Sequence, residues 1–299
     1  MDKLSQKIAL YAPDSKMPNY ALMKVSAYHK AKGDTVEWYS DMWSSTFDKV
    51  YVSKIFTYTA PISMLSGNYA MGGSGYSLNK VLPQEIEDLE PDYSIYPEMD
   101  YALGFLTRGC IRKCDYCVVP EKEGYIKPYR DIKEVLQGRK TAVLFDNNVL
   151  ACEYGIKQIE KIGKMNIKVD FNQGLDCRLI DDSMARLLSK VNWLKPLRMS
   201  CDSLSMIQPL IKATKLLRWY NCKPFVYSVY VLIDDLETAI EITKVVKGLN
   251  LDPFGQPYRD KKGTEPPKEN KDLARWTDHK AIFKSVWWEN YGKITETAS

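Results

Sequence analysis

Three of the chain's seven cysteines lie close together, and they carry its clearest chemical signature. Cys110, Cys114 and Cys117 have the spacing C-x3-C-x2-C. They follow a run of aromatic and aliphatic residues, 101–106, that predicts a strand. Three soft thiolates on one short loop are ligands that zinc and iron–sulfur clusters prefer. The spacing therefore predicts a metal centre on a loop that follows a strand.

The fourth ligand distinguishes the two kinds of metal centre. A structural zinc ion needs a fourth protein ligand, yet His29 and His279 are both distant from the loop in the sequence. No second C-x-x-C pair completes a four-cysteine zinc site. A [4Fe-4S] cluster held by three cysteines leaves one iron open to a ligand from outside the protein. A zinc-binding or disulfide-forming loop is the alternative.

In this motif the chain resembles the radical S-adenosylmethionine enzymes, whose signature is C-x3-C-x2-C with an aromatic residue just before the last cysteine. Tyr116 matches that aromatic position. The resemblance implies that Cys110, Cys114 and Cys117 bind a [4Fe-4S] cluster whose open iron chelates S-adenosylmethionine. It also implies that an external electron donor of the flavodoxin or ferredoxin type reduces the cluster. The cofactor is then cleaved to a 5'-deoxyadenosyl radical, which abstracts hydrogen from a substrate.

Strands and helices alternate after the cysteine loop. The expected strands are 101–106, 141–145, 167–171, 197–201, 224–232 and 250–253, and the expected helices are 128–140, 153–165, 182–191, 204–218 and 236–249. This pattern predicts an α/β fold with a partial (β/α)6 TIM-like barrel over residues 98–257, the architecture that the resembling family uses. Right-handed crossovers would place the carboxyl ends of all the strands on one rim, where barrel enzymes have their chemistry.

Polar residues at this rim are candidates for binding S-adenosylmethionine. In the resembling family, a segment after the second strand meets the methionyl amino group, and a polar side chain after the fourth meets the ribose or the carboxylate. The cofactor-binding candidates are Tyr116, Asp146, Asn148, Asn172, Arg178, Ser200 and Asp202. Further polar residues at the expected strand ends are Asp176, Asp234 and Tyr258. An ordinary helix cap or loop charge is the alternative for each rim residue.

Two other cysteines, Cys177 and Cys201, lie at or just beyond expected strand ends. Either is a candidate catalytic residue that donates a hydrogen atom to a substrate radical, although free cysteine is usually buried packing material. The substrate is not identified: a shortened barrel leaves a wide lateral opening, which slightly favours a macromolecule such as a nucleic acid or peptide. The competing class is a non-catalytic protein in which the cysteine loop holds iron–sulfur or zinc as a structural clip.

Residues 1–97 predict a small, doubly wound α/β domain followed by a hinge. Strands are expected at 7–12, 35–39 and 49–53, and a helix at 19–32. Their order resembles a shortened cobalamin-binding domain, but the D-x-H-x-x-G motif that would supply a histidine to cobalt is absent. His29 falls inside the expected helix, which favours packing. The G-G-x-G run at 72–75 predicts a tight turn, with a phosphate-binding loop as the alternative.

Residues 258–299 are expected to form a charged, exposed loop to about residue 273, followed by an aromatic helix at 274–291. The net charge of +4 is small for 299 residues, so it neither requires nor excludes a nucleic-acid partner. No apolar run approaches the roughly 18 residues of a membrane helix. We therefore expect no membrane association and a cytoplasmic location, where thiols stay reduced.

Overall fold

The structure is a computed structural model that describes residues 5–60, 68–222 and 227–291. The chain divides into two compact units. The first is Met1–Met99 with Asp260–Thr264, and the second is Asp100–Arg259 with Glu265–Ser299. Residues 258–299, expected as a segment of their own, are thus divided between the two units. Each unit is described by itself.

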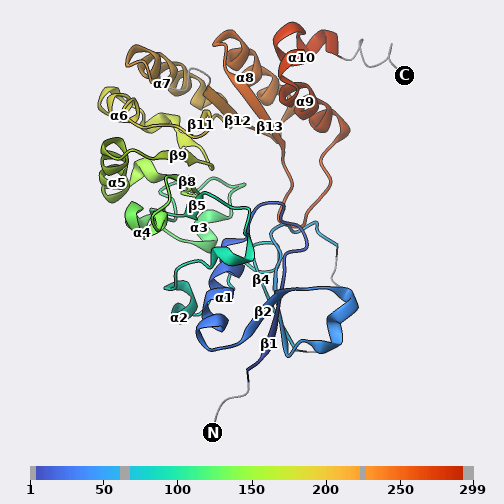
Figure 1. The fold of residues 1–299 in the computed structure, drawn as a ribbon. Helices are drawn as coiled ribbons and strands as arrows, with labels where there is room; N and C mark the ends of the chain where they lie inside the picture. Colours follow the sequence, from blue (N-terminus) through green and yellow to red (C-terminus); the bar gives the residue numbers. More distant parts are fainter. Residues whose placement is uncertain (1–4, 61–67, 223–226, 292–299) are drawn as a thin grey trace. The chain divides into compact units, whose positions relative to one another are not determined.

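The first unit contains a four-stranded parallel sheet in the order β2-β1-β3-β4 (Figure 1). Its elements are β1 (Lys7–Tyr11), α1 (Tyr20–Ala31), β2 (Thr35–Trp38), a 3-10 helix at Asp41–Thr46, β3 (Lys49–Ser53), β4 (Tyr69–Gly72), α2 (Gln84–Glu87) and a 3-10 turn at Tyr93–Ile95. Ile8, Ala9 and Leu10 of β1 are fully buried, which places this strand at the centre of the unit. The expected strands and the long helix are present, whereas β4 lies partly in what was expected to be the hinge.

His29 is buried near the end of α1, as expected for a packing residue. Its Nδ1 atom lies 2.7 Å from the carboxylate of Asp34, and its Nε2 atom lies 3.0 Å from the hydroxyl of Tyr51. Both ring nitrogens therefore have protein partners.

The second unit contains two parallel sheets whose strands follow chain order. One consists of β5 (Ala102–Gly104), β8 (Thr141–Leu144) and β9 (Lys168–Phe171), and the other of β10 (Leu175–Asp176), β11 (Leu197–Ser200), β12 (Tyr227–Ile233) and β13 (Asp252–Pro257). Each expected strand corresponds to one of these, although residues 224–226 of the expected strand 224–232 lie outside the described residues. Within the described parts of these two sheets, the two-residue β10 is additional. The structure is thus mixed α/β with parallel sheets.

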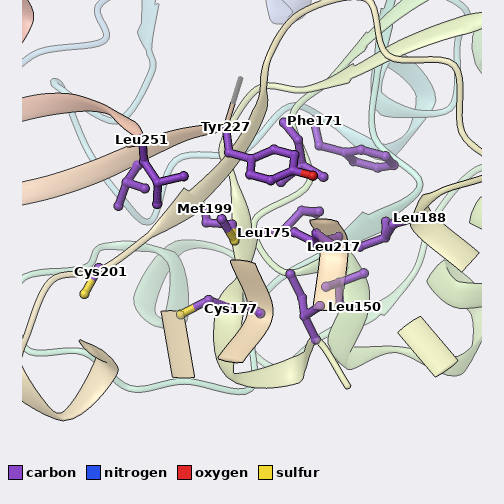
Figure 2. Close-up of a cluster of buried hydrophobic side chains, with 14 of the residues drawn as sticks. Leu150, Phe171, Leu175, Cys177, Leu188, Met199, Cys201, Leu217, Tyr227 and Leu251 are labelled. Atoms are coloured by element: carbon purple, nitrogen blue, oxygen red, sulfur yellow. The ribbon is translucent and has the colours of Figure 1, made fainter. Parts of the chain in front are cut away.

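Five helices separate these strands in the sequence, and Figure 1 shows them in a row along one side of the strands. They are α4 (Ile132–Leu136), α5 (Glu153–Lys164), α6 (Asp182–Leu188), α7 (Ile207–Trp219) and α8 (Leu236–Gly248). Their apolar faces and the strands form one hydrophobic core, part of which appears in Figure 2. Helix α4 is much shorter than the expected 128–140, because Asp131 caps its start in an extended conformation and Gln137 and Gly138 end it with left-handed φ values of 45° and 81°.

The carboxyl-terminal helix differs from the expectation of one helix at 274–291. There are two helices, α9 (Lys268–Asp278) and α10 (Lys280–Ser285), separated at His279. His279 has a non-helical ψ of 87°, and its Nδ1 accepts from the amide of Ile282 at 3.4 Å, so it caps the second helix. Pro267 precedes α9, where a missing N–H costs little. Helix α9 therefore begins inside the region expected to be an exposed loop.

No helix in the described parts of the chain is both long enough and apolar enough to cross a membrane.

Candidate metal and cofactor site

The cysteine loop lies inside a small hairpin. Its strands are β6 (Thr107–Arg108) and β7 (Lys127–Pro128), which pair in antiparallel fashion, and the short helix α3 (Val119–Lys122) lies between them. Gly109 begins the loop with a φ of 87°. A Cβ atom there would lie 2.6 Å from the carbonyl oxygen of Tyr125 and 2.7 Å from that of Gly124. Only glycine fits both the backbone angle and the space directly before Cys110.

Glu123 fastens the start of the loop. Its carboxylate accepts from the Gly109 amide at 2.8 Å and from the side-chain amide of Asn147 at 3.0 Å. The other carboxylate oxygen pairs with Arg108 at 2.9 Å. Three segments that are separate in the sequence thus meet at one carboxylate.

Asp146 holds the strand end that leads into the loop. Its carboxylate accepts from the Leu106 amide at 3.0 Å, from the Thr107 amide at 2.6 Å and from the Thr107 hydroxyl at 2.7 Å. The side chain is buried, and burial raises its pKa to about 6 despite these hydrogen bonds. In the structure this carboxylate therefore binds the protein's own backbone. Its expected contact with the ammonium group of a methionyl ligand stays a prediction.

The three loop thiols are free and partly buried. Cys110 Sγ accepts from the Arg112 amide at 3.3 Å and from the side-chain amide of Asn148 at 3.5 Å. Burial raises the pKa of the Cys117 thiol, and the neighbouring Cys114 and Cys110 thiolates raise it further, while a backbone hydrogen bond from Val119 lowers it.

Three thiolates on one loop are the donor set of both zinc sites and iron–sulfur clusters, so these residues fit either group. Among the described residues, no three His, Cys, Asp or Glu side chains are placed to share one metal ion. The hydrogen bonds to the sulfur of Cys110 are of the kind that tunes the potential of a bound cluster.

Asn148 supplies an unsatisfied polar atom beside these sulfurs. Its Oδ1 atom is buried and has no hydrogen-bond partner in the structure. Its Nδ2 atom contacts Cys110 Sγ and lies 3.4 Å from the carboxylate of Asp176. Buried acceptors are usually satisfied. The free oxygen thus fits a donor group of a ligand bound next to the loop.

Asp176, at the end of β10, joins the loop to the neighbouring sheet. It accepts from Arg112 Nε at 3.0 Å, and from Arg178 Nε at 2.6 Å and Nη2 at 3.0 Å. Burial would raise the pKa of Asp176, but the two guanidinium groups leave it below the usual range. Because Arg112 lies between the first two loop cysteines, this ion pair fixes the loop from within.

A cavity of about 400 Å³ opens beside the loop, and Cys114 is in its wall. Its other lining residues are Lys113, Asp115, Tyr116, Arg178, Asp202, Ser203, Met206, Asp234 and Tyr258. Most come from the cysteine loop or follow the carboxyl ends of parallel strands β10 to β13. Positive and negative groups both face this space, as a zwitterionic ligand would require.

Tyr116 and Asp202 connect the loop to β11 and β12 across one wall of the cavity. The Tyr116 hydroxyl donates to the Asp202 carboxylate at 3.1 Å, and the other oxygen of Asp202 accepts from the Leu232 amide at 3.0 Å. Burial is the main cause that raises the pKa values of both Tyr116 and Asp202. The aromatic residue before the last cysteine therefore also anchors the loop.

The structure brings some of the candidates together and separates others. Tyr116, Arg178 and Asp202 line the cavity, and Asn148 lies beside Cys110. Asn172 and Ser200 are not among the lining residues. Their carbonyl oxygens accept hydrogen bonds from Tyr230 and Cys177, respectively.

Cys177 and Cys201 lie in the hydrophobic core, with 1% and 0% of their surface exposed (Figure 2). Burial is the main cause that raises both thiol pKa values to about 12. Neither is a lining residue of the cavity. This position favours packing, and hydrogen-atom donation stays a prediction.

Sequence reasoning missed Arg112, Lys113 and Glu123. The two basic residues could have been noticed as charges between the loop cysteines. Glu123 has no signal of its own because its role depends on Arg108, Gly109 and Asn147, which come from two other segments of the chain.

Neither a comparison with models of known protein families nor one with curated proteins finds a match for this chain.

Proposed function

We propose that this chain is a radical S-adenosylmethionine enzyme with a partial (β/α)6 barrel. The observation that carries the proposal is the C-x3-C-x2-C loop itself. It follows the first strand of a parallel sheet and borders a charged cavity through Cys114. Strand order in the second unit supports the barrel, since both of its sheets follow chain order.

In this proposal Cys110, Cys114 and Cys117 hold a [4Fe-4S] cluster, and the cavity holds S-adenosylmethionine. When bound, the cluster supplies the electron and S-adenosylmethionine the radical that together allow hydrogen abstraction from an unreactive position. The protein contributes orientation and the exclusion of water.

The lining residues divide by charge. Arg178 keeps two of its nitrogens on Asp176, and its charge suits the carboxylate of a methionyl group. Lys113 is a second cation in the same wall. Asp115 and Asp234 are acceptors for an ammonium or for ribose hydroxyls. The buried Oδ1 of Asn148 is a further acceptor, positioned beside Cys110.

The substrate is proposed to be a macromolecule, nucleic acid or peptide, and the electron donor a flavodoxin or ferredoxin. Such a substrate and such an electron donor fit the proposed cytoplasmic location, where thiols stay reduced. The alternative is a non-catalytic protein with a structural metal clip.

The test is anaerobic. The cluster is reconstituted and reduced, S-adenosylmethionine is added, and 5'-deoxyadenosine is followed by chromatography. Cys114→Ala is the test variant. Cys222→Ala is the matched control, because Cys222 is a buried cysteine outside the cavity. We expect product with the unchanged protein and the control, and none with Cys114→Ala.

Metal analysis separates the proposal from the clip. About four irons with matching sulfide per chain, together with binding of S-adenosylmethionine, support the enzyme. One zinc per chain, or an intact reduced cluster that does not bind S-adenosylmethionine, would refute it.

A further inference from the structure

The segment that follows β3 in the first unit is fixed by several hydrogen bonds to one side chain. The carboxylate of Asp14, which follows β1, accepts from the amides of Ile55 at 3.0 Å and Phe56 at 2.9 Å, and from the Thr59 hydroxyl at 2.5 Å. One carboxylate therefore fixes both ends of a five-residue stretch.

The G-G-x-G run after β4 packs against the same stretch. The Gly75 amide donates to the Lys54 carbonyl at 3.0 Å, and the Ser74 hydroxyl donates to the Ile55 carbonyl at 3.0 Å. A Cβ atom on Gly75 would lie 2.5 Å from the carbonyl oxygen of Phe56. The amides of Gly75, Tyr76 and Ser77 all bond to protein carbonyls. The glycines thus permit close backbone contact, and the bonds from the Tyr76 and Ser77 amides to the Gly73 carbonyl close the turn that the sequence predicts.

The side chains held in this way remain in solvent. Phe56, Tyr58 and Tyr76 are 42%, 50% and 50% exposed. The rings of Phe56 and Tyr58 are stacked, with centroids 5.2 Å apart and planes 22° apart. Core burial does not explain why the chain fixes this backbone, because its aromatic rings gain little of it. A fixed backbone with exposed rings is the arrangement that a stacking platform needs.

The segments that carry or adjoin these rings are rich in lysine. Residues 260–264 adjoin them, since a Cβ on Gly263 would lie 3.1 Å from the Cβ of Tyr58. The Nζ atom of Lys80 lies 5.8 Å from the centre of the Tyr76 ring. The segments 12–17, 54–60, 72–81 and 260–264 together contain five lysines, Lys16, Lys54, Lys80, Lys261 and Lys262, against two aspartates, Asp14 and Asp260. The segments that form this surface therefore combine exposed aromatic rings with more lysines than aspartates.

We propose that this surface, which we call the aromatic platform, binds single-stranded nucleic acid. Bases stack on the rings of Phe56, Tyr58 and Tyr76, and the lysines attract the phosphate backbone. The lysines favour a nucleic acid over a protein partner, because lysine is depleted in the buried centre of protein–protein interfaces. This inference is independent of the proposed radical chemistry, because it uses only residues of the first unit.

The test measures fluorescence anisotropy of labelled strands of about 12 nucleotides, a length within the usual range of binding sites for single strands. Oligo(dT), oligo(rU) and a duplex of the same length are titrated with the full-length chain. We expect both single strands to bind more tightly than the duplex. The ratio of the dissociation constants of oligo(dT) and oligo(rU) shows whether the surface prefers DNA or RNA. The double variant Phe56→Ala, Tyr58→Ala should bind roughly 5- to 100-fold more weakly. Trp219→Ala is the matched control, since Trp219 is 81% exposed but belongs to α7 in the second unit.

A second variant tests the charge. Lys261→Ala with Lys262→Ala should reduce the slope of log K against log salt by about 1.4, since each phosphate contact on a single strand contributes about 0.7. Thermal unfolding followed by circular dichroism checks that each variant folds. If the alanine variants are unstable, Phe56→Trp and Tyr58→Trp keep the rings and should retain binding.

Three results would overturn the inference. They are no binding of either single strand, tighter binding of the duplex, or unchanged affinity in the folded Phe56→Ala, Tyr58→Ala variant. If neither single strand binds, the surface is tested with an apolar dye. Dye binding that is lost in the Phe56→Ala, Tyr58→Ala variant would assign the surface to a protein partner.

Discussion

Asp146 offers the sharpest test of how the cysteine loop is held. Its buried carboxylate accepts the amides of Leu106 and Thr107, which are themselves buried. Asp146→Ala leaves both donors unpaired away from water, at about 1–3 kcal/mol each. We therefore expect the free energy of unfolding to fall by about 2–6 kcal/mol. Asp146→Asn keeps one acceptor oxygen, so its loss should be smaller.

The pH dependence follows from the raised pKa of Asp146, about 6 in the folded protein against a usual value of 3.8. The folded state holds the proton more tightly than the unfolded chain, so the stability linked to this proton is complete below about pH 4. It is lost as the pH rises through 6. A shift of about 2 pKa units corresponds to about 3 kcal/mol. The advantage of the unchanged protein over Asp146→Asn should shrink by about that amount between pH 4 and pH 7.

Urea unfolding, followed by tryptophan fluorescence at several pH values, measures both effects. Glu160→Ala, an exposed change on α5, is the control and should alter stability by less than about 0.5 kcal/mol. The reasoning would be refuted if Asp146→Ala cost less than 1 kcal/mol. A difference between the unchanged protein and Asp146→Asn that grew with rising pH would refute the proposed pKa shift.

Three further predictions concern the loop and the core. Gly109→Ala should destabilise the second unit by about 2 kcal/mol or more, because alanine disfavours the positive φ and meets two carbonyl oxygens; urea unfolding measures this, and an unchanged midpoint would contradict it. Asp176→Ala should cost roughly 2–4 kcal/mol and lower the iron content per reconstituted chain, because it releases Arg112 from inside the loop; full iron content would show that the anchor is dispensable. Cys177→Ala and Cys201→Ala should each cost about 1 kcal/mol through a small core cavity while formation of 5'-deoxyadenosine continues; loss of product in a folded variant would instead support hydrogen-atom donation.

Strands in the second unit could be predicted because they are short apolar runs bounded by turn residues. β8, β9 and β11 lie where 141–145, 167–171 and 197–201 were expected. By contrast, β4 is an edge strand of the sheet in the first unit and has the sequence Tyr-Ala-Met-Gly. This sequence has neither the alternation of polar and apolar residues nor the β-branched residues that mark a strand. The break at His279 was also hidden, since the aromatic spacing of a single helix continues across it.

The sequence predicts where the site lies better than it predicts which contacts each of its residues makes. Parallel strands end on one edge, so chain order alone places Asp146, Asp176 and Asp202 near the cysteines. Which donors each carboxylate accepts depends on tertiary contacts. The Leu106 and Thr107 amides that meet Asp146 are 40 and 39 residues away in the sequence, respectively. No local pattern encodes such a pairing.

These three aspartates also explain how a short loop with little regular structure can be positioned. Each follows or ends a different strand, and each contacts a different part of the loop region. Asp146 accepts from Thr107, just before the loop, Asp176 accepts from Arg112, and Asp202 accepts from Tyr116. Because these carboxylates already accept donors from the protein, they have less capacity for a ligand than Asp115 and Asp234 in the same region. Substitution of the three should therefore reduce metal content before it weakens binding of S-adenosylmethionine. Substitution of Asp115 or Asp234 should weaken that binding while the metal content is unchanged.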